Sequence, residues 1–327
     1  MKSKLGLVVF LSVIFLVLVS PVFAGGTQEK STIDWPTKPI EIVVPTAPGG
    51  NTDLTARVAA KYLEKELGKP VVIVNMSGAS GAVGTRNVMD SKPDGYKMLW
   101  FHNTALVIHV TGLVDFIAYE VLDPVCMTVW DNSFGLYVRA NSPLNTLNDL
   151  AKEIKNNPGK LTFSSAAGGL AHLLGLSFQD MAGGKFTFID AGNDAARIIS
   201  VLGGHVDVTP SFYSAAQQYV DNGDIKCLGI VAAKRNPLMP TFPTAIEQGL
   251  NFVFSGLGFN LYAPKGTPVE IIEKVNKAIE KISLDPGYSE EMAKIGCVVG
   301  YEDTKTTAAT LRKMYSEYAP YKDLFKK

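Results

Sequence analysis

The residues of this chain best suited to chemistry lie in two glycine-rich turns, and the chemistry that they suit is anion binding. The first turn, residues 45–53, follows an apolar run, 40–44, that predicts a buried strand. Asn51 or Thr52 is predicted to cap the helix that follows. The first amides of a helix have no partner within it, and its dipole favours negative charge there. The turn therefore predicts an anion site without an arginine, although an ordinary strand-to-helix turn explains the same residues equally well.

The second turn, residues 75–84, follows another apolar run, 71–74, which predicts a second buried strand. Its glycines are spaced G-x-x-G-x-x-G rather than G-x-G-x-x-G, and no acidic residue ends the next strand. This pattern disfavours a dinucleotide site. A third strand, 98–101, leads to Asn103. Three strand-to-helix units predict a largely parallel sheet covered by helices on both faces, with ligands bound at the carboxyl ends of its strands.

The second half of the chain repeats this logic without repeating the sequence. A strand at 161–163 runs into a serine- and glycine-rich turn and a helix that carries His172. A strand at 186–189 leads to Asp190, and another is predicted at 225–231.

The strands after residue 256 are predicted to return to the first sheet. Residues 257–262 form a strand, and Thr267-Pro268-Val269-Glu270 predicts a capping box ahead of a helix. A last amphipathic helix is predicted over 306–318. The chain then crosses between two domains near 134–137 and near 254–259, and two crossings make a hinge.

The size of the chain supports this division, since about 300 residues exceed one ordinary core. We expect an α/β protein with mixed sheets flanked by helices. Its domain 1 spans 33–135 and 257–327, and its domain 2 spans 136–256.

The N-terminus reads as an export signal. Lys2 and Lys4 precede an apolar run, and Val22-Phe23-Ala24 predicts cleavage after Ala24. Residues 1–24 are therefore a predicted signal peptide and 25–32 a disordered leader, with an uncleaved anchor as the alternative. Cys126, Cys227 and Cys297 have no metal spacing; buried free thiols or one disulfide are both open.

Several classes of function are disfavoured by what the sequence lacks. The 31 basic and 31 acidic residues balance, so the sequence lacks the excess of basic residues that is typical of nucleic-acid binding. The four histidines show no HExxH spacing, and there is no G-x-S-x-G motif. We assign no catalytic residue, no metal ligand and no cofactor.

A set of short motifs, in a fixed order, resembles one family. They are Ala47-Pro48-Gly49-Gly50 with Asp53, Gly78-Ala79 with Gly81 and Gly84, Pro93-Asp94-Gly95-Tyr96, Pro158-Gly159-Lys160-Leu161 with Ser165 and His172, Gly203-Gly204-His205-Val206-Asp207, Pro243-Thr244 with Glu247 and Gly249, and Ala263-Pro264 with Gly266-Thr267-Pro268. From residue 35 to the end, the chain resembles the Bug-type extracytoplasmic solute receptors of tripartite tricarboxylate transporters.

The resemblance implies a two-domain, type II-like "Venus flytrap" binding protein of the periplasm, acting as a monomer. Its two domains would close on a small carboxylate, a di- or tricarboxylate such as citrate, held by backbone amides and water. It would deliver the ligand to a membrane permease made of one large and one small subunit. Carried over by position, the ligand would contact Pro48, Gly49, Gly50, Asn51, Gly78, Ala79, Ser165, Ala167 and Gly168.

Further candidates come from their places beside these turns: Asp53, Asn103, Ser164, His172, Asp190, Gly192, Asn193 and Asp207. For Asp53, pairing with Arg57 four residues on is favoured over ligand contact. For His172 and Asp207, structural and ligand roles are equally supported.

Three departures from the family pattern affect the ligand. Thr46 stands where an aromatic residue is common, Met76 where arginine is common, and 190–194 replaces a Tyr-Lys-Gly loop. Asp190 would repel an anion unless it binds a hydroxyl, an ammonium group, water or a cation. Two other functions remain as alternatives: an exported enzyme acting on a small organic acid, which turnover would reveal, and a ligand sensor for a signalling partner.

Overall fold

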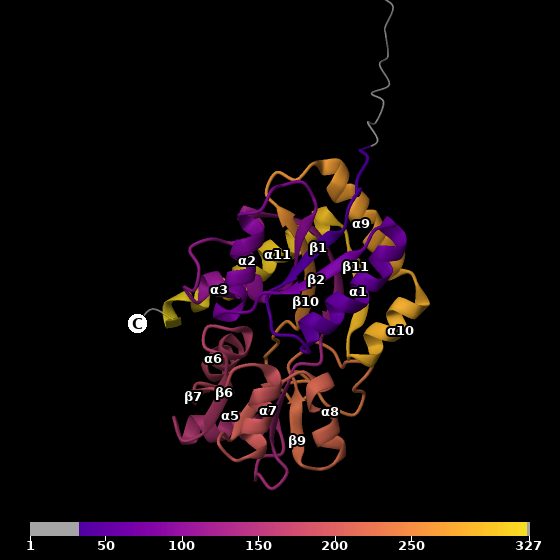
Figure 1. Cartoon of the computed structure of the whole chain (residues 1–327). Helices are drawn as coiled ribbons and strands as arrows, with labels where there is room; N and C mark the ends of the chain where they lie inside the picture. Colours follow the sequence, from indigo (N-terminus) through magenta and orange to yellow (C-terminus); the bar gives the residue numbers. More distant parts are fainter. Residues whose placement is uncertain (1–32, 326–327) are drawn as a thin grey trace, which may run out of the picture. The chain divides into compact units, whose positions relative to one another are not determined.

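A computed structural model of the chain describes residues 33–325, which form two mixed sheets flanked by helices (Figure 1). The predicted signal peptide, 1–24, and leader, 25–32, lie outside the described residues. Within the described part, no helix has the length and apolar character needed to span a membrane.

The first sheet has six strands in the order β11-β4-β10-β3-β1-β2. They are β1 (Ile40–Val44), β2 (Val71–Asn75), β3 (Lys97–His102), β4 (Leu122–Asp131), β10 (Leu257–Pro264) and β11 (Val298–Glu302). β1 is parallel to β2 and β3, whereas β10 is antiparallel to both β3 and β4. The carboxyl ends of β1, β2, β3 and β4 therefore lie at one edge of this sheet.

The second sheet has five strands in the order β7-β6-β8-β5-β9. They are β5 (Gly135–Arg139), β6 (Thr162–Ser165), β7 (Thr187–Asp190), β8 (Val208–Ser211) and β9 (Ile225–Ile230). β6 is parallel to β7 and β8, and β5 is antiparallel to β8 and β9. The carboxyl ends of β6, β7 and β8 thus share an edge as well.

Helices cover both faces of each sheet (Figure 1). On the first sheet, one face carries α1 (Asn51–Leu67), α9 (Val269–Ser283) and α10 (Pro286–Lys294), and the other carries α2 (Ala82–Met89), α3 (Thr104–Val110) and α11 (Thr304–Tyr318), with the short α4 (Ala118–Val121) against β4. On the second sheet, α5 (Leu147–Asn156) and α6 (Leu170–Ala182) cover one face, and α7 (Asp194–Leu202) and α8 (Tyr213–Asp221) the other. Two 3₁₀ segments complete the described chain, η1 (Ala79–Gly81) and η2 (Ala319–Phe325).

The strongest sequence patterns form the predicted elements. β1 has the predicted bounds, and the apolar face of α9 buries Ile271, Val275, Ile279 and Ile282. The heptad-like spacing of these residues places them on one side of the helix, where burial of each side chain contributes about 1.5–3 kcal/mol.

Three local predictions were wrong. Gly50, not Asn51 or Thr52, caps α1. Pro268 caps α9 without a side-chain bond, because the Thr267 hydroxyl donates to the carbonyl of Pro264 instead, at 2.7 Å. β2 is an edge strand rather than a buried one, and Val72 is 47% exposed.

The chain passes from β4 to β5 over residues 132–134 and from β9 to β10 over 231–256. These two connecting segments touch at Gly256. A Cβ on Gly256 would overlap the carbonyl oxygen of Asp131 and lie 2.7 Å from the Asn132 side-chain oxygen. Only glycine fits where the two segments meet.

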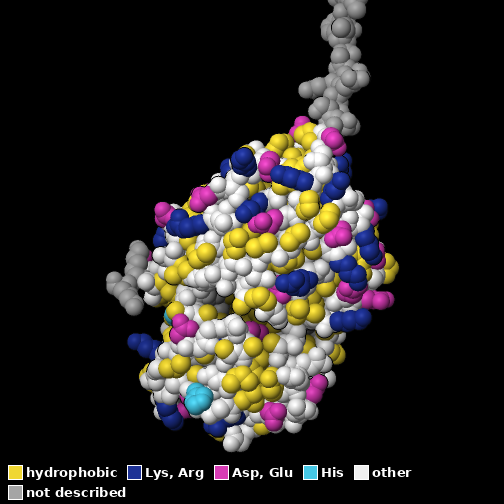
Figure 2. Space-filling view, in the orientation of Figure 1, with side chains coloured by type: hydrophobic (Ala, Val, Ile, Leu, Met, Phe, Trp, Pro, Cys, Tyr) yellow, Lys and Arg dark blue, Asp and Glu magenta, His cyan; other side chains and the backbone are white. Residues whose placement is uncertain are grey.

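Charges of both signs are interspersed on the face shown in Figure 2, without a large patch of one sign. All three cysteines are free; Cys126 and Cys297 are buried and Cys227 is partly buried.

Candidate functional site

The β1–α1 loop, residues 45–50, ends in a helix start that no side chain caps. Gly49 has a φ of +83°, and Gly50, which has no side chain, occupies the cap position of α1. The amides of the first turn of α1 are therefore not covered by a capping side chain. Such amides, together with the helix dipole, favour an anion.

Asp53 holds this loop in shape from inside. It is 2% exposed, accepts a hydrogen bond from the Gly49 amide at 2.9 Å, and pairs with Arg57 at 2.9 Å. Asn75, at the end of β2, donates to the other Asp53 oxygen at 2.9 Å. Burial by itself would raise the pKa of Asp53, but hydrogen bonds from Arg57, Gly49 and Asn75 outweigh it and lower the pKa. Its carboxylate therefore positions the loop, and the predicted pairing with Arg57 is confirmed.

The β2–α2 loop, residues 76–81, also depends on glycine. Gly78 has a φ of +141° and Gly81, the cap of α2, a φ of +99°. A Cβ at Gly81 would overlap the ring of Phe101. Between them, Ala79 and Ser80 adopt left-handed conformations, at φ +44° and +51°, which cost energy for residues with a side chain. α2, like α1, begins without a side-chain cap.

The β6–α6 loop, residues 166–169, is the counterpart in the second sheet. Gly168 has a φ of +69°, and Gly169 caps α6, again without a side-chain bond. The Gly168 amide donates to Nδ1 of His172 at 3.3 Å, so that nitrogen carries no proton in this arrangement. Burial lowers the pKa of His172 and so favours the neutral ring. The charge of Asp190 opposes this effect in part.

Two hydrogen bonds bring the loops of the two sheets together. The Ser80 hydroxyl donates to the carbonyl of Ala167 at 3.3 Å, and the Thr111 hydroxyl donates to that of Gly168 at 3.0 Å. A Cβ on Gly168 would lie 2.9 Å from the side chain of Leu113. The β2–α2 loop, the end of α3 and the β6–α6 loop are thus in direct contact.

Several candidate residues use their polar groups elsewhere. Ser164 is buried and donates to Thr209 at 2.6 Å. Asn103 is buried; its amide nitrogen donates to the carbonyl of Gly256 at 3.2 Å and to the hydroxyl of Tyr318 at 2.6 Å. Ser165 is buried as well, at the carboxyl end of β6.

The β7–α7 loop, residues 191–193, is held by its own side chains. Asp190 accepts hydrogen bonds from the amides of Gly192 at 3.1 Å and Ala167 at 3.4 Å. Asn193 caps α7 by accepting from the Ala196 amide at 3.0 Å. The carbonyl of Gly192 accepts from Arg197 at 3.0 Å.

Asp207 does not join the other candidates. It precedes β8 and accepts from the amide and hydroxyl of Thr162, at 2.8 and 2.7 Å. Thr162 begins β6, whereas Ser165 ends it. Asp207 therefore lies at the amino ends of these parallel strands, opposite the β6–α6 loop.

Sequence reasoning missed the residues that connect the loops: Ser80, Thr111, Leu113 and Asp131. Thr111 and Leu113 lie in a stretch for which no element was predicted. Asp131 accepts a hydrogen bond from Asn51 over a separation of 80 residues, at 2.6 Å. A local pattern carries no signal for such long-range partners.

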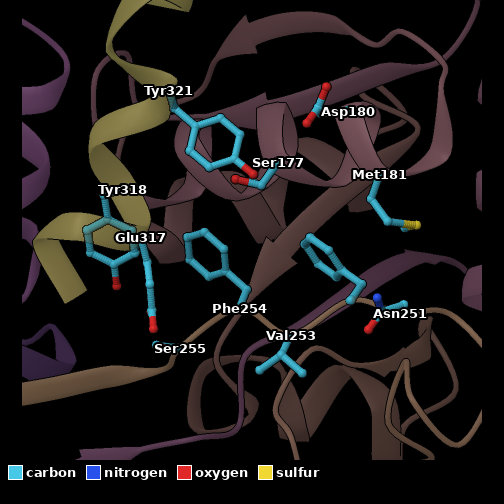
Figure 3. A pocket seen from close by; sticks show the side chains of 11 residues that line it. Ser177, Asp180, Met181, Asn251, Val253, Phe254, Ser255, Glu317, Tyr318 and Tyr321 are labelled. Carbon is cyan, nitrogen blue, oxygen red and sulfur yellow. The ribbon is translucent and has the colours of Figure 1, made fainter. Parts of the chain in front are cut away.

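A cavity of about 240 Å³ lies apart from these loops, between α6, residues 251–255 and the end of α11 (Figure 3). The rings of Phe254 and Tyr318 stack beside it with centroids 6.1 Å apart. Its lining residues include Asp180 and Glu317 but no lysine or arginine, and none of the candidate residues. Its charge does not suit an anion, which favours the glycine-capped loops as the site.

The structure has two α/β units, and in each of them glycine-rich loops follow the carboxyl ends of the strands. The loops of the two units contact each other. This arrangement defines the class of two-domain solute-binding proteins. The chain belongs to the family described as "Tripartite tricarboxylate transporter family receptor", whose model matches residues 55–317.

Individual relatives agree with this assignment. The chain is 32% identical to protein BugT of Bordetella pertussis over 277 residues, covering 84% of this chain and 85% of BugT. The fold is similar to that of the periplasmic binding protein BugD, with a TM-score of 0.78 and 28% identity, covering 89% of this chain and 98% of BugD. It is also similar to MatC of Rhodopseudomonas palustris with bound malate, with a TM-score of 0.78 and 25% identity, covering 89% of this chain and all of MatC. The chain is therefore a solute-binding receptor of this family.

Proposed function

We propose that this receptor captures a small di- or tricarboxylate between the β1–α1, β2–α2 and β6–α6 loops. The observation that carries the proposal is the set of three glycine-capped helices, α1, α2 and α6, whose first amides have no capping side chain. Each of these helices follows a strand whose carboxyl end lies at the edge where ligands bind in open α/β sheets. Backbone amides, helix dipoles and bridging water then supply the contacts that arginine supplies elsewhere.

The ligand class follows from the chemistry of these loops and is supported by the malate bound to MatC. Two carboxylates at opposite ends of one small molecule match helix starts contributed by two different sheets. Citrate belongs to the same class, as does malate.

Binding across the two sheets provides a means of signalling occupancy. We take domain 1 as residues 33–135 and 257–327 and domain 2 as 136–256, joined by the segments that touch at Gly256. A ligand that contacts both domains stabilises the form in which Ser80 meets Ala167 and Thr111 meets Gly168. A membrane permease with one large and one small subunit would recognise this form of a monomeric receptor.

The proposal includes export and excludes chemistry on the ligand. The receptor reaches the periplasm after cleavage behind Ala24. Among the candidate residues, the one imidazole, that of His172, accepts its hydrogen bond from a backbone amide rather than from a hydroxyl or thiol nucleophile.

A binding panel on the mature protein tests this function. The protein is unfolded and refolded to remove carried-over ligand, then examined by thermal shift and calorimetry. The panel contains malate, citrate, other di- and tricarboxylates, acidic amino acids, aromatic acids and neutral sugars. A ligand at about 100 times its Kd should add about 2.7 kcal/mol to the free energy of unfolding.

Binding of a di- or tricarboxylate that stays chemically unchanged supports the receptor. Binding of neutral sugars alone contradicts the role of the helix starts. Consumption of the acid shows an enzyme instead.

A further inference from the structure

Asp131 is a buried carboxyl group that the proposed binding contacts do not use. It ends β4 and is fully buried. One of its oxygens accepts from the side-chain amide of Asn51 at 2.6 Å, and the other accepts from the amide and the hydroxyl of Ser133. Asn51 is the first residue of α1, directly after the paired glycines of the β1–α1 loop.

The same hydrogen bonds continue into the second sheet. The Ser133 hydroxyl lies in the segment that joins β4 to β5, and it accepts from the amide of Tyr213, the first residue of α8, at 3.0 Å. Asp131 is therefore the central group of a chain of contacts from α1, through the connecting segment, to α8. A change at this carboxyl would therefore reach both the start of α1 and the segment that joins β4 to β5.

No cation among the described residues pairs with Asp131. From α1 it meets the neutral Asn51; from the connecting segment, Ser133. Asp194 of α7 acts on Asp131 through its charge. Burial and, in turn, the charge of Asp131 raise the pKa of Tyr137 of β5 and of Cys297, whose thiol donates to Asn51 at 3.4 Å, so these two groups face it in their neutral forms. Arg197, the nearest cation on α7, is already paired with Asp194 at 2.6 Å.

Burial raises the pKa of Asp131 to about 7, and the charge of Asp194 adds to this, while the hydrogen bonds from Ser133 and Asn51 oppose it. The carboxyl thus changes charge in the neutral pH range, where most carboxyls are fully ionised.

We propose that Asp131 takes up a proton when a carboxylate binds at the β1–α1 loop, so that binding strengthens as the pH falls. This inference rests on the proposed function. A ligand anion beside Gly49 and Gly50 is separated from Asp131 by the Asn51 side chain, and like charges this close in a buried site disfavour each other. Protonation of Asp131 removes the repulsion, and the bound anion in turn raises the affinity of Asp131 for its proton.

The sign of the pH dependence follows from this linkage. The bound form holds more protons than the free form at pH values around the pKa of Asp131, so the Kd rises with pH across that window. A shift of about one pKa unit on binding corresponds to a Kd about tenfold higher at pH 9 than at pH 6.

Calorimetry with malate as the probe, from about pH 6 to about pH 9, tests this proposal, because malate keeps the same charge over that range. Titrations in two buffers with different enthalpies of ionisation count the protons taken up. The wild type should take up a fraction of a proton near pH 7 and lose about tenfold in affinity by pH 9. Asp131→Asn, which copies the neutral form, should bind with a Kd that does not vary with pH.

Two control variants separate Asp131 from other sources of pH dependence. Asp123 lies at the other end of β4 and pairs with Lys265 at 2.9 Å, so Asp123→Asn should keep the wild-type dependence. His172→Gln should also keep it. If His172→Gln abolishes the dependence, or if Asp131→Asn retains it, the proposal is wrong.

A measurement on the wild type guards against misfolding of Asp131→Asn. Carbon NMR of the protein with labelled aspartate should show one carboxyl that titrates near pH 7 and moves to higher pH when malate is added. Malate binding with a pH-independent Kd and no proton uptake overturns this inference alone. Failure of every carboxylate in the panel to bind at any pH overturns the proposed function, and this inference with it.

Discussion

The starts of α6 and α7 occupy equivalent places in the second sheet but differ in chemistry. Both helices follow neighbouring parallel strands, β6 and β7. α6 begins at Gly169 without a side-chain cap, whereas Asn193 caps α7. At α6 the first amides are not covered by a capping side chain, and at α7 one of them is already bonded.

The same division runs through the molecule. α1, α2 and α6 begin at glycine, whereas α5, α7, α10 and α11 begin at a threonine, asparagine or aspartate whose side chain accepts an amide. α3, α4, α8 and α9 also lack a capping side chain, but they begin at asparagine, isoleucine, phenylalanine and proline rather than at glycine. A cap contributes about 1 kcal/mol to stability, which the three glycine-capped helices forgo. Because all three follow strands at the shared edges, we interpret these helix starts as places for a ligand. At α2 the amides of Ala82 and Val83 already donate to the carbonyls of Ala79 and Gly78, so the starts of α1 and α6 are the more open.

The largest expected effect comes from closing the start of α6. Gly168→Val forces a branched side chain into a left-handed conformation and against Leu113, 2.9 Å from the added Cβ. Strain and overlap together cost several kcal/mol, so the affinity for the carboxylate should fall at least about 100-fold. Calorimetry with the ligand found in the panel measures this.

Gly183→Val is the matched control for that variant. Gly183 caps the other end of α6 with a φ of +64°, and an added Cβ there meets nothing within 4 Å. The Gly183→Val variant should be destabilised by the same backbone strain but should bind the carboxylate with normal affinity. Normal binding by Gly168→Val would break the comparison between α6 and α7.

A smaller effect is expected at the start of α1. Gly49→Ala places a methyl group where no protein atom lies within 4 Å of the added Cβ, on the side left open for ligand. The left-handed φ should cost about 1 kcal/mol of stability, and the affinity should fall about tenfold. Thermal unfolding and calorimetry measure the two effects separately.

Gly266 has almost the same local structure as Gly49 and serves as its control. Its φ is +85° against +83°, its surroundings are equally open, and its amide donates to Asp123 at 2.8 Å as that of Gly49 does to Asp53 at 2.9 Å. Gly266→Ala should therefore lose the same stability without losing affinity. Equal affinity losses in both variants would show that the effect is strain and not ligand contact.

The fold was predictable where the signal is local. β1 and the buried face of α9 follow from runs and spacings that any helix or strand of that kind shows. β4 was not predicted, although it is the longest strand of the first sheet. It lies between β10 and β11, is buried on both faces, and contains Pro124, so neither alternation nor an unbroken apolar run marks it.

The site was predictable only in part, for a related reason. Glycine-rich turns after strands were found because they are contiguous in sequence. The hydrogen-bond partners of the polar side chains were not found from the sequence. Asp131, the partner of Asn51, and Tyr318, the partner of Asn103, lie 80 and 215 residues away. Asn51 was expected as a cap and a ligand contact; it does not cap α1, its side chain binds Asp131, and the ligand contact stays a prediction.

The smallest expected effect comes from Asn193, which the sequence placed among the ligand contacts and the structure places at the cap of α7. Asn193→Ala removes the bond to the Ala196 amide and should cost about 1 kcal/mol of stability, with no change in affinity. Thr146→Ala, which removes the capping box of α5, should give a similar loss of stability and serves as the reference. A fall in affinity for Asn193→Ala alone would show that the start of α7 also contacts the ligand. The ligand would then be held by four helix starts, and the contrast between α6 and α7 would be one of degree, because a capped helix keeps further amides free to bind an anion.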